Sequence, residues 1–422
     1  MRALEQRRAQ TARPSRSSVA LVRRHKPDYV LLVLTLILLA VGLIVVYSIS
    51  PALAVEKGVN GGQYVTRQLI GIGLGLGLFA VASRIPIHVW RRVLTPMLVV
   101  ACLATLLTLL LPVNEEYPAH RWIRFGGFSF QSVELLKFTL IVWLANFLVY
   151  RIEKNLLDSF QKTWRPLLLV LAAIGIVVAG LQSDLGSAAV IAAIMVAMVF
   201  VSGVPLKRVL MVGGIVLIGV VLFIATSDYR RDRLATFMNP EANCLSTGYQ
   251  ACQALIAVGS GGMAGLGLGN SVQAYGYLPE AENDSIFAIY AEKFGFIGVT
   301  VLLGLFIALF SRIKQTADRA PDEFSRLVVV GILVWLSTQA IINIGAMIGL
   351  LPLKGITLPL ISYGGSSVLM VLAVLGVVFH VSRYTTSQTA RNGYINRGDS
   401  YDNSRNGRRF RGAYNPAFGS RR

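Results

Sequence analysis

Apolar runs of about 20 residues recur along the chain and alternate with shorter polar segments. A helix of that length crosses a hydrocarbon core, whereas barrel strands would show segments of about ten residues with alternating polarity. The pattern therefore predicts an all-α fold, a polytopic bundle of about ten transmembrane helices. The predicted helices span residues 29–49, 67–84, 93–112, 133–150, 166–182, 186–203, 209–226, 284–311, 326–350 and 364–383.

The second predicted helix carries glycines at alternate positions, which make two overlapping G-x-x-x-G pairs: Gly71, Gly73, Gly75 and Gly77. Glycines at this spacing let two helix backbones approach each other closely in a membrane. We therefore expect this helix to pack tightly against a neighbour.

The distribution of charge fixes an expected orientation. Charged residues make up only 14% of the chain, yet the net charge is +19, which by itself would allow nucleic-acid binding. However, 30 of the 40 basic residues lie in the two tails and in alternate short loops, all on one side of the predicted bundle. The positive-inside rule places that side, with both termini, in the cytoplasm. Attraction to anionic lipid headgroups then accounts for the basic tails, and no nucleic-acid partner is expected.

Three regions follow from this topology. Residues 1–28 and 385–422 are basic and lack apolar periodicity, so they are predicted to be disordered cytoplasmic tails, and residues 29–384 form the transmembrane domain. On the opposite face, the long loop 227–283 is predicted to be functional and to lie in the membrane interface or re-enter the bundle. Cys244 and Cys252 share this loop and could pair in an oxidising compartment, although two small unpaired residues are the preferred interpretation.

Several charged residues fall inside or at the ends of the predicted helices. Glu134 and Lys137 lie on one face of the fourth helix, where they form either a buried ion pair that fixes helix register or part of an active cavity, and the two roles are compatible. Asp184, at the outer end of the fifth helix, either caps the sixth helix or faces a substrate.

An acidic segment marks the junction of the long outer loop with the eighth helix. Glu280, Glu282 and Asp284 lie within five residues, which makes this segment the expected place for acid–base chemistry. Capping of the eighth helix is the alternative role of Asp284. Glu292 lies about two turns deeper and is expected to pair with a cation on a neighbouring helix.

The connection between the last two predicted helices is rich in proline, glycine and hydrogen-bond donors. Such a segment either forms a rigid, tight connector or binds phosphate or sugar through its donors, which are Lys354, Ser362, Tyr363, Ser366 and Ser367. The chain has no zinc-type Cys/His cluster, Walker loop or nucleophile elbow. The energy for any chemistry must therefore come from the substrate.

Several sequence blocks together resemble one known family. They are Phe130–Lys137, Arg230–Leu234, Gly248–Gln250, Leu278–Phe287 and Ser362–Ser367 with its upstream Leu351-Pro352. In this order they resemble the SEDS family of polytopic glycosyltransferases, the FtsW/RodA/SpoVE proteins, over residues 29–384. The long N-terminal tail, the outer loop 50–66 and residues 353–355 favour the cell-division members over the elongation members.

The resemblance implies a peptidoglycan glycosyltransferase in the bacterial cytoplasmic membrane, active at the division septum. Its substrates would be lipid II and an undecaprenyl-pyrophosphate-linked glycan, joined at the 4-hydroxyl of the next GlcNAc with inversion. The essential aspartate of the family falls on Asp284, and its buried Glu and Lys fall on Glu134 and Lys137. Further candidates for substrate contact are Arg230, Arg231, Arg233, Gln250, Glu280 and Lys354.

The same resemblance implies cofactors and partners. A pyrophosphate leaving group needs positive charge, which basic side chains or a divalent cation, Mg²⁺ or Mn²⁺, would supply, and no other cofactor is expected. The expected partners are a class B penicillin-binding protein, which is a transpeptidase, and other division proteins.

Some positions depart from the family pattern. Ser132 and Ser183 replace common prolines, Ala274 replaces a common lysine, and residues 282–285 differ from the usual His-Thr-Asp-Phe. The last two departures change the expected substrate contacts. Two other functions remain open on the sequence, a lipid II flippase and a non-catalytic division scaffold.

Overall fold

The computed structural model describes residues 22–111, 122–125, 128–225, 231, 235–239 and 244–386. They fall into two compact units, which are described separately. In the smaller unit, β1 (Val22–Arg24) pairs with β4 (Tyr384–Thr386) in antiparallel register, with Arg23 opposite Thr385. The inner ends of the two predicted tails therefore pair as strands, and residues 1–21 and 387–422 lie outside the described residues.

In the larger unit, residues 26–383, the regular secondary structure within the described ranges is helical apart from one hairpin. Its hairpin pairs β2 (Trp122–Phe125) with β3 (Phe128–Gln131). Short π-helical segments, η1 (Phe160–Trp164) and η2 (Gly175–Leu181), flank α7. The α-helices are α2 (Tyr29–Lys57), α3 (Gln63–Ala82), α4 (Ile87–Arg92), α5 (Leu94–Leu110), α6 (Ser132–Glu153), α7 (Arg165–Ile174), α8 (Leu185–Val201), α9 (Leu206–Ala225), α11 (Tyr249–Ser260), α12 (Ile286–Asp318), α13 (Glu323–Met347) and α14 (Gly365–Val381).

Helix occupies each range that the apolar pattern predicts. Among the described residues, six helical spans are long and apolar enough to cross a membrane by length and composition, and α5, α8 and α14 are shorter apolar helices. The main differences lie at the outer ends. Helix α2 continues through Pro51 to Lys57, and α11 forms within the loop predicted at 227–283.

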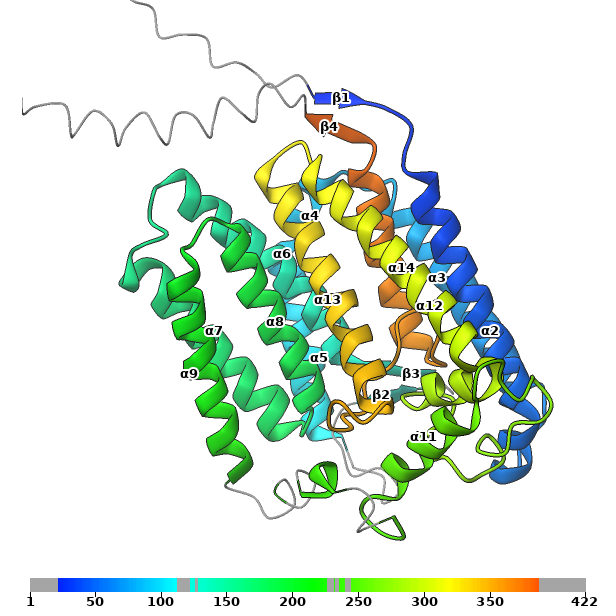
Figure 1. Ribbon diagram of the computed structural model, residues 1–422. Coiled ribbons are helices and arrows are strands. Elements are labelled where there is room, and N and C mark those ends of the chain that lie inside the picture. The colour runs from blue at the N-terminus through cyan, green and yellow to red at the C-terminus, as the bar shows by residue number, and fades with distance from the viewer. Residues whose placement is uncertain are drawn as a thin grey trace, which may run out of the picture. The chain divides into compact units, whose positions relative to one another are not determined.

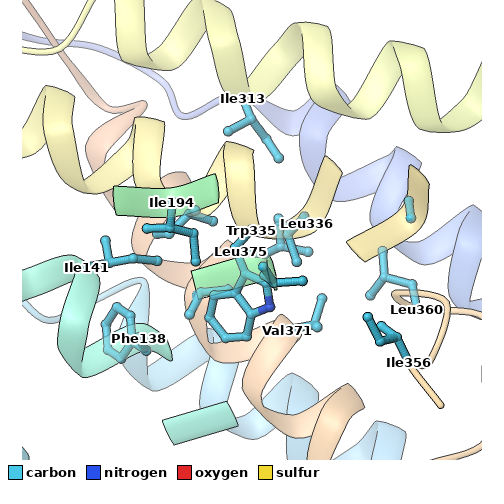
Figure 2. Packing of buried hydrophobic residues seen from close by; sticks show 14 of the residues in the cluster. Phe138, Ile141, Ile194, Ile313, Trp335, Leu336, Ile356, Leu360, Val371 and Leu375 are labelled. Atoms are coloured by element: carbon cyan, nitrogen blue, oxygen red, sulfur yellow. The ribbon is translucent and has the colours of Figure 1, made fainter. Parts of the chain in front are cut away.

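Helix α13 lies between α8 and α12 and also packs against α6 (Figure 1). Figure 2 shows the indole of Trp335, from this helix, among Leu336, Val371 and Leu375. These side chains are fully buried or nearly so. In a membrane such packing stabilises the bundle through van der Waals contact rather than through exclusion of water.

Helices α3 and α14 pack closely because of two of the four predicted glycines. A Cβ on Gly75 would lie 2.5 Å from Leu372 Cδ1, and one on Gly71 would lie 3.5 Å from Gly365 Cα. Gly73 and Gly77 face open space. The predicted close packing is therefore present, and one face of α3 carries it.

The glycine-dense end of the outer loop packs against a break in α12. Gly295 interrupts this helix with a φ of 61°, which favours glycine. The freed backbone groups bind the loop: Leu266 N donates to Glu292 O at 2.9 Å, and Phe296 N donates to Gly262 O at 2.9 Å. Irregular backbone is thus satisfied within the protein, as a bundle in lipid requires.

Cys244 and Cys252 form a disulfide, with their Cα atoms 5.6 Å apart. The preferred interpretation of two unpaired residues was therefore wrong. The turn 244–248 leads directly into α11 and brings Cys244 beside the first turn of that helix, where Cys252 lies. Spacing alone does not reveal such a turn.

Asp28 links the start of α2, the last two turns of α12 and the end of α14. Its Oδ1 accepts hydrogen bonds from Val30 N and Leu31 N and so caps α2, while its Oδ2 pairs with Arg312 Nε at 2.8 Å. Its backbone N–H donates to Ser382 Oγ at 3.0 Å, just after α14.

We expect Asp28→Ala to lower the free energy of unfolding by about 1–2 kcal/mol, because the cap and a partly exposed ion pair are lost together. Thermal unfolding in detergent measures the change. Glu323→Ala is the control, since it removes the exposed ion pair with Arg326 and no cap. Equal effects of the two substitutions would contradict the capping role of Asp28.

Candidate functional site

The segment 279–285, which we call the acidic turn, ends where α12 begins. Glu280 has a positive φ of 52°, and its carbonyl accepts hydrogen bonds from Asn283 N at 3.0 Å and Ser285 N at 3.1 Å. The Asn283 side-chain amide donates to the Glu280 carboxylate. These bonds close the turn and fix the backbone of Asp284.

The segment 348–364, which we call the connector, lies against the acidic turn. Ser362 Oγ donates to Asn283 O at 2.6 Å, and Tyr363 N donates to Glu282 O at 2.8 Å. Asn343, on α13, donates through Nδ2 to Asp284 O at 2.7 Å. The two segments, far apart in sequence, are therefore joined directly and through α13.

Asp284 does not cap α12. The cap position is Ser285, and no side chain makes a capping bond there. Asp284 Oδ1 is instead buried without a hydrogen-bond partner among the described residues. Burial, and next the charge of Glu280, raises the pKa of Asp284 from 3.8 to about 7. The capping alternative for Asp284 is therefore wrong in this structure.

Asp284 lines a small, partly open pocket together with Lys354 from the connector. The other lining residues are Ile342, Asn343, Ala346, Met347, Gly355 and Ile356. A residue with a carboxyl group of raised pKa and a lysine thus line one small pocket. Such a pair can accept a proton from a hydroxyl group and stabilise a negative charge beside it.

Gln250 contacts the acidic turn from α11, where its Nε2 donates to Ser285 Oγ at 3.1 Å. Ser285 Oγ in turn donates to Pro279 O at 2.9 Å. The disulfide at Cys252 anchors the same helix two residues further along. The sequence analysis named Gln250 as a candidate for substrate contact, and the structure places it against Ser285, the residue after Asp284.

A second ionic group lies beside the acidic turn and was missed by the sequence analysis. Lys57, at the end of α2, pairs with the buried carboxylate of Glu282 at 2.9 Å. The rings of Tyr64 and Tyr363 pack 5.3 Å apart beside it, and Arg67 hydrogen-bonds to the Tyr363 side chain. Lys57 and Arg67 are basic residues on the predicted outer side, where the positive-inside rule disfavours them. Two basic residues on the outer side are an exception to this rule, and that exception could have pointed to this ionic group.

Glu134 and Lys137 form the predicted ion pair, 2.7 Å apart and buried on both sides. Lys137 Nζ also donates to Gln339 Oε1 at 3.1 Å and lies 4.7 Å from the centre of the Trp335 ring. Gln339 Nε2 donates to Thr357 O at 3.0 Å. The pair therefore supports the connector from inside the bundle.

The serines of the last block have structural partners. Ser366 Oγ accepts a hydrogen bond from Gln131 N at 3.3 Å, and Ser367 Oγ lies 3.1 Å from Thr357 Oγ1. Of the three arginine candidates, Arg231 is exposed, whereas Arg230 and Arg233 lie outside the described residues.

Two other carboxylates accept hydrogen bonds from backbone N–H groups. Asp184 accepts from Ser187 N at 3.0 Å at the start of α8, which is the capping role that the sequence left open. Glu292 was expected to pair with a cation, and this was wrong: its carboxylate accepts from Ser271 Oγ, from Val272 N at 2.8 Å and from Gln273 N at 3.1 Å. A loop that folds back onto α12 supplies donors that a helix-only prediction does not contain.

Within the described part of the chain, no group of three or more His, Cys, Asp or Glu side chains is arranged to hold a metal ion. The carboxylates nearest Asp284 already have partners. Glu280 binds Asn283, and Glu282 binds Lys57.

Comparison with known proteins identifies the family. A family model for the cell cycle proteins FtsW, RodA and SpoVE matches residues 29–387. The chain belongs to the FtsW/RodA/SpoVE family. This match covers every helix of the larger unit, together with the acidic turn, the connector and both ionic groups described above.

Relatives within the FtsW/RodA/SpoVE family cover most of the chain. A probable peptidoglycan glycosyltransferase FtsW from Coxiella burnetii is 40% identical over 85% of this chain and 96% of its own length. Stage V sporulation protein E from Bacillus subtilis is 39% identical over 86% of this chain and 99% of its own length.

Solved structures show the same fold. A chain of a peptidoglycan synthase complex, from work on how polymerization and crosslinking are coordinated, has a TM-score of 0.66 and 27% identity, covering 85% of this chain and 98% of its own. The rod shape determining protein RodA of Thermus thermophilus has a TM-score of 0.59 and 27% identity, covering 85% and 97%. The apolar helices and these relatives agree with a multi-pass membrane protein.

We expect Glu134→Ala to lower the free energy of unfolding by about 3–5 kcal/mol, because it leaves the Lys137 ammonium buried without its carboxylate. The midpoint of thermal unfolding in detergent measures the loss. Glu153→Ala, at the exposed end of the same helix, should change it little. The double variant Glu134→Ala with Lys137→Met should recover part of the loss, and additive effects in this cycle would disprove a stabilising pair.

Proposed function

We propose that this chain is a peptidoglycan glycosyltransferase that polymerises lipid II at the outer face of the bacterial cytoplasmic membrane. The FtsW relatives are named probable peptidoglycan glycosyltransferases, and they align over nearly their whole length. The observation that carries the proposal is the state of Asp284: its Oδ1 is buried without a described partner, and the residue lines a pocket with Lys354.

The proposed reaction is one inverting displacement. The 4-hydroxyl of the acceptor GlcNAc gives its proton to the Asp284 carboxylate as its oxygen attacks the anomeric carbon of the donor glycan. The bond from that carbon to the pyrophosphate oxygen breaks, and undecaprenyl pyrophosphate leaves with the electron pair. A base with a pKa near 7 suits this step, because it is ionised at neutral pH yet still attracts the proton.

The leaving pyrophosphate needs positive charge. Lys354 is our first candidate, because it lines the pocket of Asp284. Arg231 and the neighbouring Arg230 and Arg233 are further candidates from the family pattern, as is a divalent cation, Mg²⁺ or Mn²⁺. Lys137 is a weaker candidate, since Glu134 and Gln339 already engage its ammonium group.

We propose a topology of ten transmembrane helices with both termini in the cytoplasm and the loop 227–283 outside. The basic tails support this orientation. The Cys244–Cys252 disulfide supports it independently, because such bonds persist in oxidising compartments. The acidic turn would then lie at the outer end of α12, where a lipid-anchored sugar can reach it.

We further propose a role at the division septum with a class B penicillin-binding protein, a transpeptidase that would cross-link the strands. The FtsW names of several relatives support the septal role, and the structural similarity to a chain of a peptidoglycan synthase complex supports the partnership.

Asp284→Asn should abolish polymer formation from purified lipid II, with a loss of about 100-fold or more, because an amide cannot accept the proton. Gel separation of labelled glycan strands measures the product. Asp322→Asn is the matched control: Asp322 caps α13, and asparagine caps about as well. Near-normal polymerisation by Asp284→Asn would overturn the assignment of the base, and leaflet exchange of lipid II without polymer in the unsubstituted protein would overturn the proposed reaction.

The pKa of Asp284 also predicts how stability depends on pH. The unfolded chain ionises this carboxyl near pH 3.8 and the folded protein near pH 7, so folding loses stability as the pH rises through that interval. We therefore expect Asp284→Asn to unfold at a higher temperature than the unsubstituted protein at pH 8. At pH 4 the difference should be small, and an equal difference at both pH values would contradict the raised pKa.

Activity should depend on the same carboxyl group, but it should rise with pH where stability falls. The value of kcat/KM for lipid II should rise with pH around a midpoint near 7, as the base loses its proton. Glu280→Gln removes a charge that raises the pKa, so the midpoint should shift to lower pH. Asp158→Asn, at an exposed ion pair with Arg208, serves as the control and should leave the profile in place.

A further inference from the structure

Asn343 is held in one orientation by two backbone carbonyls. Its Nδ2 donates to Asp284 O at 2.7 Å and to Ile356 O at 2.7 Å. An amide nitrogen has two hydrogens, and both are used here. The opposite orientation of the amide would set its oxygen against two carbonyl oxygens. The positions of Nδ2 and Oδ1 are therefore determined by the hydrogen bonds.

The other end of this amide has no described partner. Asn343 is 2% exposed, and its Oδ1 is buried without a hydrogen bond among the described residues. Asp284 Oδ1 is in the same condition. A buried acceptor without a donor is unfavourable, and two of them in one place point to a ligand that brings donors.

Gln339 shows that a buried amide on α13 can have hydrogen-bond partners at both of its polar atoms. It lies one turn before Asn343 and is also a buried amide that ties the connector to the helix. Its Oε1 accepts from Lys137 Nζ at 3.1 Å and from Trp335 Nε1 at 2.8 Å, and its Nε2 donates to Thr357. Both polar atoms of this side chain are satisfied within the protein.

The residues that line the pocket indicate the chemical class of the ligand. Asn343 and Asp284 both line it, as does Lys354. A divalent cation would satisfy two oxygen acceptors, but the positive charge of Lys354, which also lines the pocket, disfavours it. The described residues also hold no group of three or more His, Cys, Asp or Glu side chains arranged to bind such an ion. A sugar carries hydroxyl groups on adjacent carbons, and such groups supply two donors at the spacing of neighbouring side chains.

We propose that Asn343 Oδ1 accepts a hydrogen bond from the 3-hydroxyl of the acceptor sugar, which lies on the carbon next to the one that bears the attacking 4-hydroxyl. This contact deepens the proposed function and rests on it. With one hydroxyl held by Asn343, the sugar can present its 4-hydroxyl to Asp284 Oδ1. Because Asn343 also binds the backbone of Asp284, one side chain positions both the base and the acceptor sugar.

The test compares acceptor analogues of lipid II in which the GlcNAc lacks either its 3-hydroxyl or its 6-hydroxyl. In the unsubstituted protein, loss of the contacted hydroxyl should lower kcat/KM about tenfold. In Asn343→Leu this difference should disappear, although the rate with natural lipid II also falls. Gln339→Leu is the matched control, and it should lower the rates with natural and deoxy acceptors by the same factor. Asn343→Ser replaces Asn343→Leu if the latter does not fold.

Three results would overturn the contact. They are equal use of both deoxy acceptors and natural lipid II by the unsubstituted protein, discrimination that persists in the Asn343 variants, and discrimination that is lost equally in Gln339→Leu. Binding of the same lipids, measured by native mass spectrometry, separates this proposal from the proposed reaction. Asn343-dependent preference for the hydroxyl without any polymer would retain the contact and refute the transferase.

Discussion

The site depends on one constraint, that backbone groups inside the bundle must find hydrogen-bond partners within the protein. The acidic turn and the connector are both non-helical, and each supplies partners to the other. Ser362 and Tyr363 bind carbonyls of the turn, and Asn343 binds one carbonyl from each segment. The position of Asp284 is therefore a result of how two irregular segments satisfy each other. Substitutions in the connector should act on the carboxyl group without touching it.

The sequence predicted the helices well, because long apolar runs leave few alternatives in a chain of this composition. It failed where structure depends on contacts between segments. Pro51 suggests a helix end, yet α2 continues to Lys57, whose ammonium group pairs with Glu282. Glu292 lies in an apolar helix and suggests a cationic partner, but a returning loop supplies its donors. Neither partner lies near in sequence.

The residues of the candidate site also fall into those that the sequence identified and those that it missed. Asp284, Lys354 and Gln250 were identified from their residue types and from the family blocks, and the structure brings them to one place. Asn343 and Gln339 were not identified. An amide in an apolar helix carries no charge and belongs to no local pattern, so its role becomes visible only when its hydrogen bonds are counted. No sequence pattern indicates that Asn343 Oδ1 lacks a hydrogen-bond partner among the described residues.

The contact between Asp28 and Ser382 has a consequence for the connectivity of the chain. The backbone N–H before α2 donates to a side chain directly after α14, so the helical unit begins and ends at the same point. The path of the chain through its helices is therefore nearly circular, and it is interrupted only at this point. A short linker across this point, with new ends cut between α12 and α13 at Ala320, would give a circular permutant with every helix contact retained. In such a protein, the acidic turn and the connector would belong to opposite ends of the chain and still meet around Asn343.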